Sequence, residues 1–371
     1  MLLWADGFEH YGTNTTKMLD GVYANASDSL DNTLAQYGST SYKMVGDGSS
    51  SLSDVSLRKV LPASNTKMGV MFHLYVPSLP NVNDKHVICD FTSSLARQSQ
   101  VSCVLDSNGA IRFLRGTAYA GAFGTAGTLI ATTTPIITAA SWNHVEIQVY
   151  IHASAGWVRV AVNGVHRFEA TGLNTQYDTS QIASVTHRLA NGTGGPFFNV
   201  DNLILYDFLG TAAVETDFCP TVDGGGKATN YIGELQCVYL PPNANTAQDT
   251  WAKSTGTSAF AVVSELAPND ADYIFSSTLA DLTELALADL PTQITYIRGV
   301  MVVGRMAKSD SGAAQTQFGL KSAAAITDAT SRPITTVPTY WWDFINVDPN
   351  TAARWTRASL NAALLRLKRS L

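Results

Sequence analysis

Residues 141–170 read SWNHVEIQVYIHASAGWVRVAVNGVHRFEA and carry the clearest structural signal of the chain. Four apolar side chains of the first half alternate with polar ones and would share one face of a strand: Val145, Ile147, Val149 and Ile151. The second half repeats this alternation in WVRVAV and then has Asn163-Gly164, a pair that accepts the positive φ angles of a two-residue hairpin loop. The stretch therefore predicts antiparallel strands joined by tight turns.

The same alternation recurs along most of the chain in short runs bounded by Gly, Asn, Asp and Pro. Helical periodicity is almost absent, and such closely spaced runs are typical of β-sandwiches and jelly rolls. Residues 209–232 lose the pattern and predict a linker. We therefore expect an all-β protein, with an antiparallel jelly roll over residues 1–208 and a second, smaller β-sandwich domain over residues 233–371, for assembly or attachment. At the end of the chain we expect a short helical turn capped by Thr356, followed by a final strand.

Charged residues are scarce in this sequence. They make up 15% of it, against roughly 25% in typical soluble domains, which suggests a surface covered by copies of the same chain. The net charge of −6 argues against nucleic acid as a partner, because phosphate binding needs a basic surface. Residues 354–371 contain no acid but five basic residues: Arg354, Arg357, Arg366, Lys368 and Arg369. This group is either a solvated basic end or a docking strip for an acidic neighbour.

Signals for export and membrane insertion are missing. The first ten residues, MLLWADGFEH, lack the basic and apolar regions of a signal peptide, and no stretch approaches the roughly 18 apolar residues that cross a bilayer. The four cysteines show no CxxC spacing. Cys89 and Cys103 could face each other in a hairpin, and in a chain made and folded in the cytoplasm we expect them to be reduced.

Patterns of catalytic residues are not found either. Enzymes of the β-glucanase type need two carboxylates flanking the sugar bond, but the glutamates are isolated and no E-x-D-x-x-E run occurs. The chain has no G-x-S-x-G nucleophile elbow, and GGGKAT at residues 224–229 lacks the Ser or Thr of a phosphate loop. We therefore expect no catalytic residues and no enzyme.

Tryptophans are the candidates for contacts with a ligand or another subunit. Trp142 has apolar neighbours along its strand and is expected in the core. Adjacent strand residues point to opposite faces, so only one of Trp341 and Trp342 can enter a given core. The other would stack on a sugar, lie under a loop, or be buried against another subunit, which we favour in a protein so poor in charge. Trp157 is the third candidate for an interface or for sugar stacking.

Three stretches resemble known proteins. The hairpin SWNHVEIQVYI…GWVRVAVNGV resembles the laminin-G and pentraxin-type members of the concanavalin-A-like jelly rolls. The opening ADGFEHYG (residues 5–12) is similar to the start of many virion proteins of tailed bacteriophages built on this fold, and YWWDFINVDPNTAARWT (residues 340–356) resembles their C-terminal part. The resemblance implies a structural protein of a phage particle, in the tail or another exposed attachment.

Metal ions have weak support. The histidines are scattered, and His144 is expected to hold a loop by hydrogen bonds. Related laminin-G domains bind calcium through loop aspartates and backbone carbonyls, for which this chain offers Asp84, Asp106 and Asp178, although nothing in their spacing demands calcium. We predict no cofactor, with calcium as the open alternative.

These features together predict a non-enzymatic structural protein of the virion. We expect it to be synthesised in the host cytoplasm, to form a homo-oligomer, and to contact other virion proteins. The alternative is a carbohydrate-binding module that attaches to a cell-surface glycan of the host. A glycan depolymerase is the least favoured, because paired carboxylates are missing.

Overall fold

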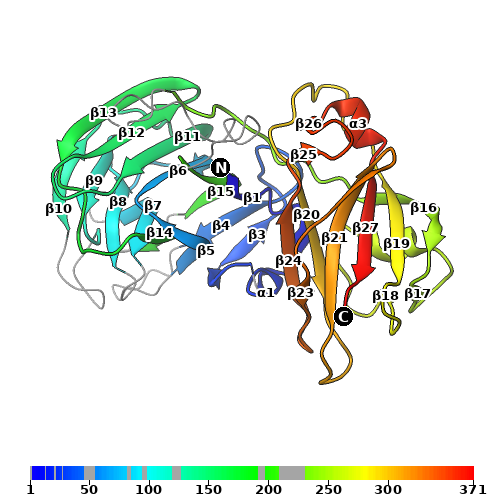
Figure 1. Cartoon of the computed structure of the whole chain (residues 1–371). Coiled ribbons are helices and arrows are strands. Elements are labelled where there is room, and N and C mark those ends of the chain that lie inside the picture. Colours follow the sequence, from blue (N-terminus) through cyan, green and yellow to red (C-terminus); the bar gives the residue numbers. More distant parts are fainter. Residues whose placement is uncertain are drawn as a thin grey trace.

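The computed structural model describes the chain over these ranges: 2–12, 14–20, 22–26, 28–45, 55–81, 85–93, 98–118, 127–190, 197–208 and 230–371. Regular structure there is almost entirely antiparallel β-strand, which confirms the all-β prediction. Figure 1 shows two groups of strands side by side, which we call the sandwich (strands from Leu2 to Asp207) and the C-terminal unit (strands from Pro242 to Arg369). No helix in the described ranges is long and apolar enough to cross a membrane.

The sandwich consists of two antiparallel sheets in the jelly-roll arrangement that the sequence predicts. The first sheet contains, in spatial order, β13 (Val165–Leu173), β12 (Gly156–Val162), β11 (Ser141–Tyr150), β6 (Lys67–Val76), β15 (Phe197–Asp207), β4 (Ser41–Val45) and β3 (Ser29–Asp31), with β1 (Leu2–Asp6) also paired to β15. The second sheet contains β10 (Thr128–Thr132), β9 (Ile111–Arg115), β8 (Ser99–Leu105), β7 (Lys85–Ser93), β14 (Ile182–Ala190), β5 (Val55–Asn65) and β2 (Asn25–Ala26).

Alternating side chains of both sheets fill one core between them. Residues of β11 and β12 that the sequence predicts to face inward are fully buried there: Val145, Ile147, Val149, Val158, Val160 and Val162. Asn163 and Gly164 connect β12 to β13 with φ angles of 53° and 74°, as the hairpin prediction requires. Cys89 and Cys103 lie directly opposite each other on β7 and β8, both buried and both free thiols.

The start of the chain folds around one buried carboxylate. Asp6, at the end of β1, accepts hydrogen bonds from the Phe8 backbone N–H at 2.8 Å and from the hydroxyls of Tyr11 and Tyr23 at 2.9 and 2.8 Å. The short helices η1 (Glu9–Tyr11) and α1 (Thr15–Met18) follow. Phe8 has a φ of 67°, a conformation held by these contacts. The ADGFEHYG segment is therefore a turn that the hydrogen bonds to Asp6 stabilise.

The C-terminal unit is built on one larger sheet with small hairpins around it. The sheet contains β16 (Pro242–Asp249), β19 (Leu282–Leu287), β27 (Leu364–Arg369), β21 (Gln315–Ser322) and β22 (Ala325–Asp328), with β23 (Arg332–Pro333) also paired to β21. The hairpins are β17 (Ala252–Lys253) with β18 (Ile274–Phe275), β20 (Met301–Met306) with β24 (Thr339–Phe344), and β25 (Val347–Asp348) with β26 (Ala353–Arg354). Helices α2 (Ala259–Val263) and α3 (Arg357–Asn361) complete it, and Thr356 caps α3 just before β27, as predicted.

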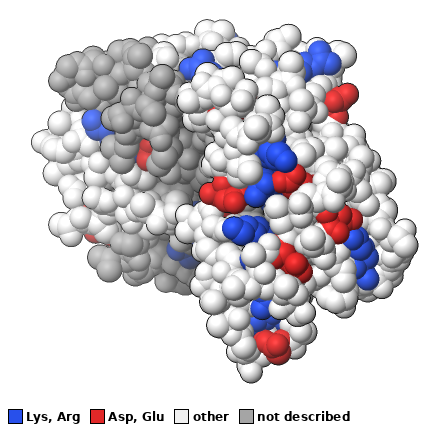
Figure 2. All heavy atoms as spheres, turned by 45° about the vertical axis from the view of Figure 1, so that its right-hand side comes forward, with Lys and Arg blue, Asp and Glu red and all other residues white. Residues whose placement is uncertain are grey.

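Charged side chains are sparse on the described part of one face of the molecule (Figure 2). The face drawn in Figure 2 is largely white, and its blue and red residues lie close to one another. This matches the charged fraction of 15%. Where charges occur in the C-terminal unit, several form ion pairs, such as Arg305 with Asp20 and Asp270 at 2.7 and 2.6 Å.

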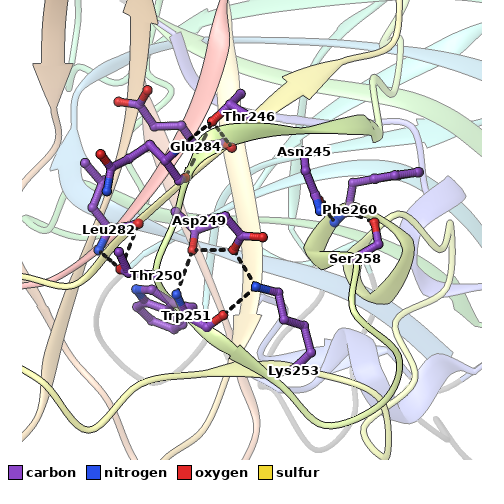
Figure 3. A network of polar contacts seen from close by, with 12 residues as sticks. Asn245, Thr246, Asp249, Thr250, Trp251, Lys253, Ser258, Phe260, Leu282 and Glu284 are labelled. Atoms are coloured by element: carbon purple, nitrogen blue, oxygen red, sulfur yellow. Dashed lines mark hydrogen bonds and ion pairs between the residues drawn. The ribbon is translucent and has the colours of Figure 1, made fainter.

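A polar network closes the edge of the C-terminal sheet, where β16 shifts register against β19 between Asn245 and Asp249 (Figure 3). Asp249 Oδ1 accepts from Lys253 Nζ at 2.7 Å and from the Thr283 hydroxyl at 3.3 Å. Asn245 Oδ1 accepts from the Phe260 backbone N–H at 2.9 Å, which ties α2 to β16. Across the irregular register, the hydroxyls of Thr246 and Thr250 donate to the backbone oxygens of Glu284 and Leu282 at 2.9 and 3.0 Å, so these β19 oxygens have hydrogen-bond partners.

Strand β24 joins the two groups. Tyr340 and Trp342 point toward the sandwich, whereas Trp341 points into the core of the C-terminal unit. The Tyr340 backbone N–H donates to Asp20 O at 2.7 Å, and the Trp342 ring centroid lies 4.8 Å from that of Trp4. The predicted linker, residues 209–232, lies outside the described residues up to residue 229, and the domain limits 1–208 and 233–371 stay predictions.

Candidate functional site

Two aromatic side chains lie opposite each other on the outer face of the first sheet. Register places Trp142 of β11 beside Tyr75 of β6, with ring centroids 5.6 Å apart, and both rings are half-buried. The expectation that Trp142 enters the core is therefore wrong. Val145 is three residues further along and faces inward, so strand alternation turns Trp142 outward. The alternation relative to Val145 can be read from the sequence, but the expectation for Trp142 was based on its apolar neighbours instead.

Two histidines form the next outward pair on the same strands. His144 lies opposite His73, and their ring centroids are 5.5 Å apart. Glu234 Oε1 lies 3.1 Å from His73 Nε2 and accepts from the Tyr37 hydroxyl at 2.8 Å. Sequence reasoning missed this group, because Tyr37 and Glu234 come from irregular segments far apart in the chain. We call the set the β6–β11 surface: Tyr37, His73, Tyr75, Trp142, His144 and Glu234.

Burial sets the charges of this surface. It lowers the pKa of His144 to about 4, aided by the neighbouring His73, and it also lowers the pKa of His73. Burial opposes the ionisation of Glu234, but hydrogen bonds from Tyr37 and His73 outweigh it and lower the carboxyl pKa. At neutral pH the surface therefore carries two neutral imidazoles and one carboxylate, whose side chain is 45% exposed.

Several ring nitrogens of the histidines lack a partner at normal hydrogen-bond geometry. His73 Nδ1 and both ring nitrogens of His144 are buried without a hydrogen bond of normal geometry to any residue the structure describes. A weaker hydrogen bond to the Gly233 backbone does act on His144, so its predicted role, holding a loop by hydrogen bonds, stays a prediction. Buried polar atoms normally have partners, so a polar group of a ligand that reached them would be stabilised. The surface can stack sugar rings on Trp142 and Tyr75 and offer hydrogen bonds beside them.

Residues 230–237 cover the neighbouring part of the same sheet. The backbone N–H groups of Ile232 and Gly233 donate to the Glu146 carboxylate at 2.8 and 3.0 Å, and Cys237 N–H donates to Asn202 Oδ1 at 2.6 Å. Burial raises the pKa of Glu146 to about 6 against these bonds. We call residues 230–237 the covering segment.

Trp157 lies beneath this cover. It is 3% exposed, packs with Phe208 and Ile232, and has its ring centroid 5.8 Å from that of Phe208. Trp157 is therefore a buried residue of this chain and is not available for stacking a sugar or contacting a subunit.

The other candidate tryptophans also pack within the chain. As predicted from strand alternation, Trp341 and Trp342 point in opposite directions. Trp342 contacts Trp4 and the ammonium group of Lys59, which is 3.9 Å from its ring centroid. The surface that was expected to meet another subunit is thus occupied by the sandwich, an intramolecular partner that sequence alternation alone does not identify.

The basic residues near the C-terminus do not form one strip. Arg366 is 6% exposed and forms ion pairs with Glu284 and, at 3.1 Å, with Asp328. Arg369 Nη1 donates to Ser276 O at 2.7 Å, and Lys368 is half-buried on β27. Arg354 and Arg357 lie elsewhere, on β26 and α3. Because alternate residues of β27 face opposite sides of the sheet, its basic side chains lie in different surroundings.

Two of the three aspartates offered for calcium make other contacts in the structure. Among the described residues, no group of three or more His, Cys, Asp or Glu could hold a metal ion. Asp84 lies outside those residues, Asp106 forms an ion pair with Arg112 at 3.5 Å, and Asp178 accepts a hydrogen bond from Gln100 at 2.7 Å.

Two other carboxyl groups, those of Glu9 and Asp201, have raised pKa values. Burial, helped by the negative charge of Asp201, raises the pKa of Glu9 to about 8, and burial raises the pKa of Asp201 to about 6.

Comparison with known proteins finds similar solved structures only. No protein-family model and no curated protein sequence matches the chain. Among solved structures, an endo-β-1,4-glucuronan lyase from the fungus Trichoderma reesei matches 58% of this chain and 98% of its own at 13% identity, with a TM-score of 0.43. The catalytic domain of a glycoside hydrolase family 131 protein from Coprinopsis cinerea matches 57% and 96% at 14% identity, with a TM-score of 0.36. The carbohydrate-binding module CBM66 from Bacillus subtilis matches 50% and 91% at 10% identity, with a TM-score of 0.28.

These matches correct one prediction. We expected a non-enzyme, but a lyase and a hydrolase catalytic domain are among the similar structures, so that expectation is wrong as an inference from this fold. The missing E-x-D-x-x-E run excludes one arrangement of catalytic carboxylates within a single strand. It does not address side chains that meet from separate segments, as Glu234 and His73 do.

Proposed function

We propose that the protein binds a saccharide on the β6–β11 surface. The observation that carries this proposal is the pair of half-buried rings, Trp142 and Tyr75, directly beside the hydrogen-bonded Tyr37, Glu234 and His73. The apolar face of a pyranose stacks on aromatic rings, and its hydroxyls need donors and acceptors nearby. The names of the similar structures, which include a carbohydrate-binding module, agree with this ligand class.

The test is a binding measurement on the full chain with a panel of oligosaccharides, followed by calorimetry of any ligand found. Trp142→Ala is expected to weaken binding by about 30-fold, because removing an aromatic anchor commonly costs about 2 kcal/mol or more. Tyr273→Ala is the matched control, since Tyr273 is an aromatic residue of the C-terminal unit and is 51% exposed. Equal affinity of the Trp142→Ala variant and the wild type would contradict the proposal.

Catalysis on the bound saccharide is a second candidate function. Glu234 is ionised at neutral pH, half exposed, and hydrogen-bonded to Tyr37, so it could accept a proton from a bound sugar or a water. Release of shorter saccharides would be followed by chromatography. We expect Glu234→Gln to abolish release while keeping most of the binding, and unchanged release would rule Glu234 out.

A place in a phage particle is a separate proposal. It rests on the sequence resemblance of residues 5–12 and 340–356 and on the sparse charge. With it come the proposals of self-association, of contacts with other virion proteins, and of attachment to a host glycan. Light scattering during size-exclusion chromatography tests self-association, and a monomer at high micromolar concentration would contradict it.

A further inference from the structure

One carboxylate of the β6–β11 surface has an oxygen to spare. Glu234 Oε1 lies 2.8 Å from the Tyr37 hydroxyl and 3.1 Å from His73 Nε2, whereas Oε2 has no hydrogen-bond partner among the described residues. No Lys or Arg within the described part of the chain forms an ion pair with this carboxylate, although Glu284, for comparison, lies 3.0 Å from Lys321. The Glu234 side chain is 45% exposed, so a ligand can reach it.

The other charges on this side of the first sheet do not offset Glu234. Register places Lys43 of β4 two strands from Tyr75, and Lys43 Nζ lies 3.7 Å from Asp31 Oδ2, which balances its charge. Asp201 of β15 lies beside His73 and is a second carboxylate at neutral pH. Both imidazoles of the surface are neutral there. The surface therefore has a net negative charge and attracts a cation.

The two rings beside Glu234 also favour a cation. Tyr75 and Trp142 are the next outward residues after His73 and His144, about 7 Å along their strands. Their ring centroids are 5.6 Å apart, and both side chains are half-buried, which leaves part of each ring exposed. The face of an indole or phenol ring attracts an ammonium group and also stacks on the apolar face of a pyranose.

The ligand that fits best brings a positive charge on a ring. Glu234 Oε1 accepts from Tyr37 and from His73 Nε2, which is the donor because an ionised carboxylate can only accept. A neutral sugar offers the remaining oxygen a hydroxyl, whereas an ammonium group offers a charge-assisted hydrogen bond, about twice as strong. A lysine side chain of a partner protein carries its charge on a flexible stem. An amino sugar carries it on a ring that stacks.

We propose that the β6–β11 surface binds amino sugars, in which a protonated amine replaces a hydroxyl, in preference to neutral sugars. The ammonium group donates to Glu234 Oε2, and the pyranose ring lies against Trp142 and Tyr75. An N-acetyl group removes the charge, so N-acetylated sugars lose this preference. The inference names the ligand class of the proposed function and rests on that function.

The experiment compares three β-1,4-linked tetrasaccharides, of glucosamine, N-acetylglucosamine and glucose, by calorimetry on the full chain. At about pH 6 the amines are protonated and Glu234 is ionised. We expect the glucosamine tetrasaccharide to bind at least about tenfold more tightly than the other two. In Glu234→Gln we expect the ratio of these affinities to fall close to one. Glu265→Gln is the matched control, since it removes a glutamate of the C-terminal unit, and the ratio stays as in the wild type.

The outcomes separate this inference from the proposed function. Equal affinity of the wild type for the glucosamine and glucose tetrasaccharides overturns the inference alone. A preference that persists in Glu234→Gln also overturns it, because the ammonium group then binds elsewhere. Competition by tetralysine as strong as that by the glucosamine tetrasaccharide overturns it in favour of a basic protein partner. The proposed function itself fails if Trp142→Ala binds all three tetrasaccharides as the wild type does.

Discussion

Lys59 is a buried lysine between aromatic rings. It is 2% exposed, its Nζ lies 3.4 Å from the Trp4 ring centroid and 3.9 Å from that of Trp342, and it donates to Val22 O at 2.8 Å. Burial lowers its pKa to about 7 from the usual 10.5. The folded state therefore disfavours the charged lysine, and stability is lost as the pH falls from about 10.5 to about 7.

Lys59→Met removes this titration. Between pH 10 and pH 7 we expect the free energy of unfolding of the wild type to fall by about 2–4 kcal/mol more than that of the variant, the lower value reflecting attraction of the ammonium group to the rings. Urea unfolding at several pH values measures the difference. Parallel curves for the two proteins would show that Lys59 keeps its ordinary pKa.

Glu9 gives the opposite dependence. Its folded pKa of about 8 lies above the ordinary 4.5, so its contribution to stability is complete below about 4.5 and is lost as the pH rises through 8. Glu9→Gln imitates the protonated group, and we expect it to be more stable than the wild type by about 2 kcal/mol at pH 9 and equal at pH 4. Thermal melts at pH 4 and pH 9 measure the difference. Equal stability of the two proteins at pH 9 would show that Glu9 keeps its ordinary pKa.

At the scale of elements, two glycines are needed for different reasons, one for lack of space and one for its backbone conformation. Gly69 of β6 lies under the Tyr206 ring, and a Cβ there would be 2.0 Å from the ring. Gly164 has a φ of 74° in its hairpin, but a Cβ there would meet nothing within 4 Å. We expect Gly69→Ala to destabilise by roughly 3 kcal/mol through overpacking and Gly164→Ala by only about 1 kcal/mol through backbone strain. Equal losses in urea unfolding would contradict this ranking.

The strands are also where sequence reasoning works best. Alternation over β11 and β12, the Asn163-Gly164 turn and the Thr356 cap are local signals, and the structure follows each of them. The β6–β11 surface depends on non-local contacts. Trp142 could have been assigned to it by counting along the strand, but Glu234 reaches His73 across 161 residues, through a segment with no regular pattern.

For the whole molecule, the contacts of β24 indicate how the stabilities of the sandwich and the C-terminal unit are coupled. Trp342 packs on the sandwich and Trp341 in the C-terminal unit. We expect Trp342→Ala to speed amide hydrogen exchange in β1 and β5, and Trp341→Ala to speed it in β21 and β27. A loss of about 2 kcal/mol in local stability corresponds to an increase of about 30-fold in the exchange rate where local opening controls exchange. Identical exchange patterns for the two variants would mean that the groups open only together.

The covering segment sets an order of events during synthesis. Ile232 and Gly233 supply the backbone donors for Glu146, which the sandwich alone lacks. While the ribosome has released only the strands up to Asp207, this carboxylate faces water. The nascent sandwich therefore keeps a hydrated outer face that becomes dry only when the following residues emerge. A stalled or truncated chain would expose the Trp157 side chain to chaperones and proteases, whereas the complete chain conceals it.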